Sequence, residues 1–250
     1  MGNLDNNALY GLLLSLGTFL LSMFLTPFYT YVAYKYHFWK KQKKTTVSGD
    51  GLPIMTKLHA HKFKRVFPTM AGIIGVIAVT VVTLLCNFDR AQTWLPIFGF
   101  LGGAIVGLID DGINVFGSGE GAAGLRAPIK FAMITVVSLV LGWFFAYKLG
   151  WTSIHIPFAG DIEIGGVVMV GLFTFAVVAT SNAVNISDGL DGLAGGLAMM
   201  AYGAFGTIAL FRGQVYLFAF CMTVVGWLFS YVWFNVPPAR FMMGDVGSFA

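Results

Sequence analysis

Apolar runs of about 20 residues recur along the whole sequence, and they constrain the fold more than any other feature. A helix needs about 20 residues to cross the roughly 30 Å hydrocarbon layer of a bilayer, and backbone amides inside lipid must bond to one another. Only 10% of the 250 residues are charged and 57% are hydrophobic, whereas about 25% of a soluble domain is charged. The sequence therefore predicts an all-α, polytopic transmembrane helical bundle and excludes a soluble globular fold.

About seven membrane spans are predicted. They cover residues 8–34, 66–86, 93–109, 127–148, 165–184, 192–211 and 215–234. The first run is too long for a signal-peptide core and no basic residues precede it, so we expect it to be retained as a helix. Residues 1–250 then form a single membrane-embedded domain. Cys86 and Cys221 lie in or at the end of separate spans, which predicts packing roles and neither a disulfide nor a metal site.

Basic residues orient the predicted bundle, because Lys and Arg gather on the cytoplasmic side of membrane proteins. Placing residues 35–65 in the cytoplasm puts twelve of the fifteen Lys and Arg on that side. Arg90, Lys148 and Arg212 are then outside, with the amino terminus. We interpret the cluster Lys40–Lys44 as an anchor to anionic lipid head groups.

The same topology brings five carboxylates to the cytoplasmic ends of different helices. They are Asp110, Asp111, Asp188, Asp191 and Asp245. Charges near a membrane are costly and are kept mainly for function, so we predict a shared polar pocket. Solvated loop charges are the alternative interpretation. Four other acids, Asp5, Asp89, Asp161 and Glu163, fall outside and receive no role.

On the outer side, residues 154–164 alternate apolar and polar side chains around Pro157 and Gly160. Alternation of this kind, interrupted by a turn, is typical of a β-hairpin. We predict a short hairpin that lies on the membrane, in which His155 has a structural role.

The first motif begins with the adjacent acids Asp110 and Asp111, at the end of a span and before a glycine-rich loop to Gly124. Neighbouring residues on a helix point about 100° apart, so the two carboxylates cannot serve one ligand in the same way. We expect one to face a reacting phosphate and the other to hold a Lys or a water molecule.

The second motif, residues 181–195, combines amides, acids and glycines. Asn182 and Asn185 precede Asp188 and Asp191, and a spacing of three places both acids on one face if the segment is helical. Hard oxygen ligands of this kind suit hydrated Mg²⁺, which is commonly shared with substrate phosphates. A calcium loop is the alternative, but the spacing of acids does not continue as such a loop requires.

The third motif, residues 234–248, leaves the last span through Pro237 and Pro238 and presents Asp245 between glycines. Proline stops a helix and glycine frees the backbone, so we expect Asp245 to be held in a fixed, non-helical position. Arg240 could contact an anionic group, or its side chain could simply extend to the membrane surface.

A fourth segment, residues 61–72, brings His61, Lys62, Lys64 and Arg65 to the entrance of the second span. These side chains suit a doubly anionic partner. A basic interfacial collar without a catalytic part is the alternative interpretation.

In this order and at these helix ends, the four segments resemble the polyprenyl-phosphate N-acetylhexosamine 1-phosphate transferases over nearly the entire chain. Residues 182–195 resemble the family's asparagine and aspartate motif, and residues 234–248 resemble its phenylalanine-asparagine to glycine-aspartate motif. Residues 68–72, preceded by His61 and Lys64, are more similar to the muramoyl-pentapeptide branch than to the N-acetylglucosamine branch.

The resemblance implies a transferase that moves phospho-N-acetylmuramoyl-pentapeptide from its UDP carrier to undecaprenyl phosphate and releases UMP. It implies Mg²⁺ as cofactor, a bacterial inner membrane as location, and an active site that faces the cytoplasm. The lipid bilayer and the two substrates are the expected partners, nucleic acid is not, and a homodimer is left open. UDP-N-acetylglucosamine is the alternative donor.

Residue roles follow from the resemblance by position. Asp245 and Asn185 would hold Mg²⁺, and Asp110 would deprotonate or orient the lipid phosphate with Asp111 beside it. Asp110, Asp111 and Asp245 are thus the predicted catalytic residues. The predicted substrate-binding residues are Thr69, Asp188 and Asp191 on the nucleoside side, His61, Lys64 and Lys130 near the phosphates, and Asn235. Direct transfer and a covalent phosphoryl-aspartate intermediate both remain compatible with the sequence.

The chain departs from the family pattern at several positions. Asn114 stands where the family's first motif usually carries a lysine, so Arg126 or Lys130 would have to supply that cation. Val66, Phe67 and Ala71 replace a smaller, more glycine-rich pattern. The family also continues beyond the third motif through further helices and a histidine-rich loop, so we expect the domain to be incomplete at its carboxyl end and to have little activity alone.

Three other classes of protein are compatible with parts of the pattern. An ion or proton transporter would carry acids at mid-span, whereas the key aspartates here lie at one end. A phosphatidyl transferase would continue its Asp-Gly with Ala-Arg, but Asp188-Gly189 is followed by Leu190-Asp191-Gly192. A non-catalytic membrane scaffold remains the third alternative.

Overall fold

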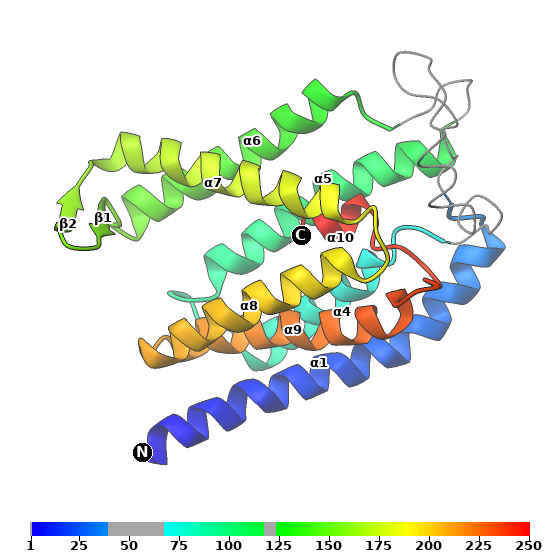
Figure 1. The fold of residues 1–250 in the computed structure, drawn as a ribbon, viewed down its shortest axis with the longest axis horizontal. Helices are drawn as coiled ribbons and strands as arrows, with labels where there is room; N and C mark the ends of the chain where they lie inside the picture. Colours follow the sequence, from blue (N-terminus) through cyan, green and yellow to red (C-terminus); the bar gives the residue numbers. More distant parts are fainter. Residues whose placement is uncertain (1, 40–67, 118–123) are drawn as a thin grey trace.

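The computed structural model describes residues 2–39, 68–117 and 124–250, and Figure 1 shows that they form a bundle of helices with a small hairpin at one end. The helices are α1 (Gly2–Lys35), α4 (Gly72–Cys86), α5 (Trp94–Phe116), α6 (Ala127–Trp143), α7 (Gly166–Ser187), α8 (Leu193–Phe211), α9 (Val215–Asn235) and the short α10 (Asp245–Ser248), and a π-helical turn, Phe144–Lys148, extends α6. The strands are β1 (Ser153–Ile156) and β2 (Gly160–Glu163). The predicted polytopic helical bundle is confirmed.

Seven helices occupy the predicted spans. Six of the described helices are long and apolar enough to cross a membrane, namely α1, α5, α6 with its π-helical turn, α7, α8 and α9. The seventh, α4, is shorter than predicted because it begins only at Gly72 and has 15 residues, or about 22 Å. The prediction of about seven spans therefore holds approximately.

The ends of the helices alternate as the sequence predicts. The carboxyl ends of α5, α7 and α9 and the amino ends of α4, α6 and α8 lie together, on the right in Figure 1. The hairpin lies at the opposite end, where β1 and β2 pair antiparallel with His155 opposite Asp161. The side chains of this pair also meet, with His155 Nδ1 2.8 Å from Asp161 Oδ1. The strand pairing confirms the predicted hairpin, and its position on the membrane surface remains a prediction.

Two local predictions were wrong, and the condition attached to a third is not met. The helix that carries Asp110 and Asp111 does not end near them, because α5 continues to Phe116. Asp245 is not in a non-helical position but is the first residue of α10, directly after Gly244 with a φ of 75°. A common helical face for Asp188 and Asp191 was expected only if their segment is helical, and it is not, because α7 ends at Ser187 and both acids belong to the turn before α8.

Helix α9 is buried along most of its length and packs against α1, α4 and α8. Its contact with α1 is close at Gly226, where a Cβ atom would lie 2.1 Å from the backbone oxygen of Ser15. Small residues let membrane helices approach each other and gain packing contacts. Gly226 therefore sets the distance between α1 and α9.

Glycines also make room for α10, which folds back into the bundle against α4 and α5. A Cβ atom on Gly107 of α5 would lie 2.0 Å from the backbone oxygen of Asp245, and one on Gly103 would lie 1.9 Å from that of Phe249. On α4, a Cβ atom at Gly72 would lie 2.3 Å from Gly247 Cα. The backbone that carries Asp245 is thus pressed directly onto two helices.

We predict that Gly226→Val destabilises the bundle, since overfilling a packed contact costs about 1–3 kcal/mol. Gly203→Val in α8 is the matched control, because a Cβ atom there meets nothing within 4 Å. Thermal unfolding in detergent should show a lower midpoint for the first variant and little change for the second. Equal midpoints for the two variants would contradict the proposed close contact.

Candidate functional site

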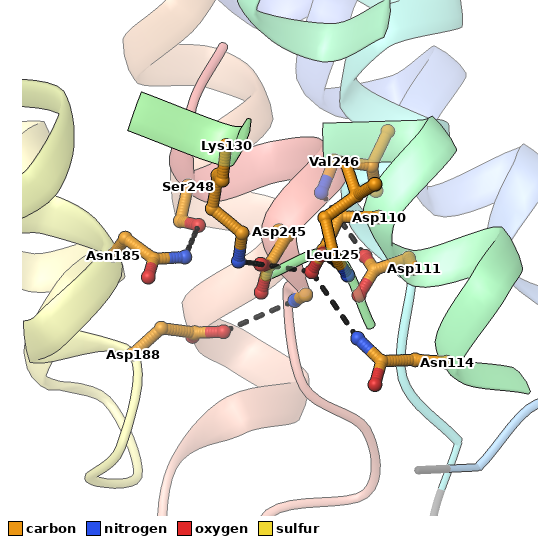
Figure 2. A network of polar contacts seen from close by, with 11 residues as sticks. Asp110, Asp111, Asn114, Leu125, Lys130, Asn185, Asp188, Asp245, Val246 and Ser248 are labelled. Atoms are coloured by element: carbon orange, nitrogen blue, oxygen red, sulfur yellow. Dashed lines mark hydrogen bonds and ion pairs between the residues drawn. The ribbon is translucent and has the colours of Figure 1, made fainter. Parts of the chain in front are cut away.

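Lys130, in the first turn of α6, joins aspartates from two other elements. Its Nζ atom lies 2.9 Å from Asp110 Oδ2 on α5 and also donates to Asp245 Oδ2 on α10. Figure 2 shows Lys130 beside both carboxylates. The Asp110 side chain is 2% exposed and that of Asp245 is 10% exposed. Buried charges are tolerated only when they are paired, so this pairing accounts for the presence of the acids here.

Asp110 has two further donors. Its Oδ1 accepts a hydrogen bond of 2.7 Å from the backbone N–H of Leu125, and its Oδ2 accepts one of 3.1 Å from the side-chain amide of Asn114. Asn114 stands where the family's motif usually has lysine, and here it supplies a neutral donor. Of the two residues expected to supply the cation instead, Lys130 lies in the site and Arg126 is exposed.

Asp111 is fully buried and serves a different partner. Its Oδ2 accepts a hydrogen bond of 3.1 Å from the backbone N–H of Val246, the residue after Asp245. The two adjacent carboxylates thus have different contacts, because Asp110 binds Lys130 and Asp111 holds the α10 backbone. That one of them faces a reacting phosphate remains a prediction.

The backbone before Asp245 is held by two other side chains. The hydroxyl of Tyr231 on α9 accepts a hydrogen bond of 2.9 Å from the N–H of Met243 and donates one of 3.4 Å to Asp188. Asp188 Oδ2 in turn accepts one of 3.0 Å from the N–H of Gly244. Together with Asp111, these side chains fix the chain on both sides of Asp245.

Asn185 lies against α10 at the end of α7. Its amide nitrogen donates a hydrogen bond of 2.8 Å to Ser248 Oγ, so a cation would have to use its amide oxygen. The metal role of Asn185 remains a prediction.

Asp191 and Asn235 connect the turn after α7 to the loop after α9. Asp191 Oδ2 accepts a hydrogen bond of 3.2 Å from the N–H of Ala239. Asn235, 1% exposed, accepts one of 2.7 Å from the N–H of Gly192 and donates one of 2.8 Å to the Phe241 carbonyl. Both side chains thus brace the loops, and their binding to a substrate remains a prediction.

The remaining predicted substrate residues lie near the start of α4. Thr69 is 5% exposed, and its backbone carbonyl accepts a hydrogen bond from the hydroxyl of Tyr29. Its predicted contact with the nucleoside is not tested. His61 and Lys64 lie outside the described residues.

Two contributors were missed in the sequence. Tyr231 precedes Asn235 by one helical turn and so lies on the same face of α9, which was the available signal. Ser248 lies within the third motif but its hydroxyl was not singled out. Tyr231 accepts a hydrogen bond from a backbone N–H and Ser248 accepts one from the Asn185 side chain. Neither of the two carries charge.

A carboxylate oxygen from each of Asp110, Asp111 and Asp245 lies within 4.8 Å of the others. Three carboxylates against the one ammonium of Lys130 leave a formal surplus of two negative charges. Oxygen ligands of this type are those that Mg²⁺ prefers, so the residues present fit a divalent cation. Asp245 is common to this group and to the predicted metal pair with Asn185.

Residues 93–250 match the family model described as glycosyl transferase family 4, which is more than half of the chain. The chain belongs to glycosyl transferase family 4. The matched residues include Asp110, Asp111 and Asp245, which together form the acid cluster. The family resemblance predicted from the motifs is confirmed.

Curated relatives in this family are named phospho-N-acetylmuramoyl-pentapeptide-transferase. The one from Lactobacillus helveticus is 37% identical over 194 residues, which are 76% of this chain and 59% of that protein. The one from Chloroflexus aggregans is 33% identical over 245 residues, which are 95% of this chain and 64% of that protein. The chain thus spans about three-fifths of the length of these relatives.

We predict that Tyr231→Phe loosens the backbone before Asp245, because the Met243 N–H loses its acceptor and an unsatisfied buried donor costs about 1–3 kcal/mol. Hydrogen–deuterium exchange of residues 243–248 should become faster. Tyr216→Phe, at the opposite end of α9, is the control and should leave these amides unchanged. If exchange in Tyr231→Phe equals that of the unmodified chain, the bracing role is wrong.

Proposed function

We propose that this glycosyl transferase family 4 protein transfers a sugar phosphate from a UDP-linked donor to undecaprenyl phosphate and releases UMP. Phospho-N-acetylmuramoyl-pentapeptide is the proposed transferred group, in keeping with the names of the curated relatives. The observation that carries the proposal is the meeting of Asp110, Lys130 and Asp245, from three elements, at one end of a membrane bundle. A lipid phosphate and a water-soluble nucleotide can meet only at the boundary between membrane and water, where this end of the bundle is expected to lie.

In the proposed reaction, an oxygen of the lipid phosphate attacks the phosphorus next to the sugar. The bond from that phosphorus to the oxygen of the UMP phosphate breaks, and UMP leaves. Asp110 is held by Leu125, Asn114 and Lys130, so it is well placed to orient the lipid phosphate or to accept its proton. Lys130 places positive charge beside the phosphoryl group, where negative charge must be stabilised during transfer.

Asp245 is the proposed principal Mg²⁺ ligand, with Asn185 as the second predicted ligand and the Asp110 and Asp111 oxygens near it. Bound Mg²⁺ would supply Lewis-acid stabilisation of the diphosphate. The contacts of Tyr231, Asp188 and Asp111 with the backbone around Asp245 keep its carboxylate in place without any rearrangement at the moment of reaction.

We further propose a bacterial inner membrane as the location, with the acid cluster facing the cytoplasm. The support is the charge asymmetry, since twelve of the fifteen Lys and Arg are assigned to the side that carries the cluster. UDP-linked sugars would then reach the site from the cytoplasm, and the lipid phosphate from the inner leaflet.

The donor is tested by supplying the full-length gene product with undecaprenyl phosphate and either UDP-N-acetylmuramoyl-pentapeptide or UDP-N-acetylglucosamine. We expect UMP release with the first donor only. Release with the second donor alone would reassign the sugar, and release with neither would contradict the proposed function.

Asp245→Asn should lower UMP release by on the order of 100-fold or more, because a neutral amide binds a divalent cation poorly and no longer pairs with Lys130. Asp161→Asn is the matched control, since Asp161 is exposed in the hairpin at the opposite end. It should keep full activity. Substantial turnover by Asp245→Asn would remove Asp245 from the metal role.

Chelation of divalent cations with EDTA should abolish UMP release, and added Mg²⁺ should restore it. The unfolding midpoint of the same protein should rise with Mg²⁺, because a cation that binds only the folded state stabilises it. Asp245→Asn should lose most of this rise. Full turnover in EDTA would contradict a metal-dependent reaction.

A further inference from the structure

Met70 holds a backbone conformation that residues with a side chain avoid. Its φ is 71°, in the left-handed region that is uncommon for any residue except glycine. Two other described non-glycine residues have a positive φ, His37 and Phe158, and both are exposed, whereas Met70 is 3% exposed. Such a conformation persists only where the surrounding structure enforces it, and residues of this kind cluster at functional sites.

Backbone pairing with the third motif enforces the turn at Met70. Residues 68–72 lie along residues 242–243, joined by three hydrogen bonds of 2.8 to 3.1 Å. The N–H of Met242 donates to the carbonyl of Pro68, and those of Ala71 and Gly72 donate to the carbonyls of Met242 and Met243. These bonds lie on both sides of Met70 in the chain. An ordinary negative φ at Met70 would turn the chain away and break this pairing.

The Met70 side chain packs against the first turn of α10. It forms a buried apolar cluster with Ala104 of α5 and Val246 of α10, and Val246 directly follows Asp245. The backbone of Gly244 is also close, since a Cβ atom there would lie 2.7 Å from the Met70 nitrogen. Met70 therefore contacts the residues on both sides of Asp245.

The residue before Met70 is fixed as well. The N–H of Thr69 donates a hydrogen bond of 2.7 Å to the Phe38 carbonyl, and the Thr69 carbonyl accepts one from the Tyr29 hydroxyl. Thr69 is the residue predicted to face the nucleoside, and Asp245 is the proposed principal Mg²⁺ ligand. Met70 thus lies between the segment for the nucleoside and the segment for the cation.

We propose that Met70 is a positioning residue for Asp245. Its side chain holds α10 at the distance at which the Asp245 carboxylate reaches the cation, and its left-handed turn keeps Thr69 in register with α10. The buried apolar side chain binds no ligand itself and acts through Asp245. The inference rests on the proposed function, which supplies the metal role of Asp245 and the nucleoside role of Thr69.

Three variants separate positioning from general stability. Met70→Ala removes the packing against Val246, whereas Met70→Leu keeps it, because exchange of Met and Leu conserves volume. Met169→Ala is the matched control, since Met169 is 5% exposed but lies near the start of α7, beside the hairpin at the opposite end of the bundle. Both Ala variants should lower the unfolding midpoint, because each removes a buried side chain.

The experiment uses the 250-residue chain in detergent micelles and has two readouts. Mn²⁺, as a paramagnetic probe of the Mg²⁺ site, is titrated by electron paramagnetic resonance, and hydrogen–deuterium exchange is followed at residues 243–248. Met70→Ala should weaken Mn²⁺ binding about tenfold, the lower end of what losing the support of a metal ligand costs, and should speed exchange. Met70→Leu should restore both, and Met169→Ala should leave both unchanged.

Equal Mn²⁺ affinity in Met70→Ala and the unmodified chain, no rescue by Met70→Leu, or an equal loss in Met169→Ala would overturn the proposal. Absence of Mn²⁺ binding by the unmodified chain would instead refute the metal role of the acid cluster and with it the proposed function. Hydrogen exchange then decides alone. Faster exchange of residues 243–248 in Met70→Ala but not in Met169→Ala would support the positioning role, and unchanged exchange would overturn it.

Discussion

The ion pairs of Lys130 with Asp110 and Asp245 are the interaction on which the polar end of this bundle depends. Each partner comes from a different element, and each is substantially buried. Removing one member of a buried ion pair leaves an unpaired charge and costs about 3–5 kcal/mol. The three elements are therefore fixed relative to one another by charge as well as by packing, and the glycines of α4 and α5 allow α10 to come close enough for this pairing.

The aspartates near Lys130 occur in similar sequence motifs but make two kinds of contact. Asp110 and Asp245 face the cation of Lys130. Asp111, Asp188 and Asp191 accept hydrogen bonds from backbone N–H groups in the segment from Ala239 to Val246. The long motifs of the sequence thus include residues that hold the loop as well as residues that are placed to act on a substrate. This division explains why so many acids are tolerated at one end of a membrane protein.

Much of this arrangement could be predicted from the sequence, because membrane spans are long, apolar and similar to one another in length. The alternation of spans placed Asp110, Asp188 and Asp245 at one end correctly, and the hairpin followed from its alternating pattern. The bracing contacts could not be predicted, because they join residues far apart in the chain. Asp111 and Val246 are separated by 135 positions and Asp188 and Gly244 by 56. The fold-back of α10 depends on glycines that no local pattern marks, so Asp245 was wrongly expected outside a helix.

The coupling between Lys130 and Asp245 tests the central claim most directly, because it does not depend on which sugar is transferred. A double-mutant cycle with Lys130→Gln, Asp245→Asn and the double variant, measured by equilibrium unfolding in mixed micelles, gives the interaction free energy. The account predicts that the two single changes are strongly non-additive, with a coupling of at least about 1 kcal/mol. Additive effects would mean that α6 and α10 do not share one buried charge cluster. They would contradict the proposed active site.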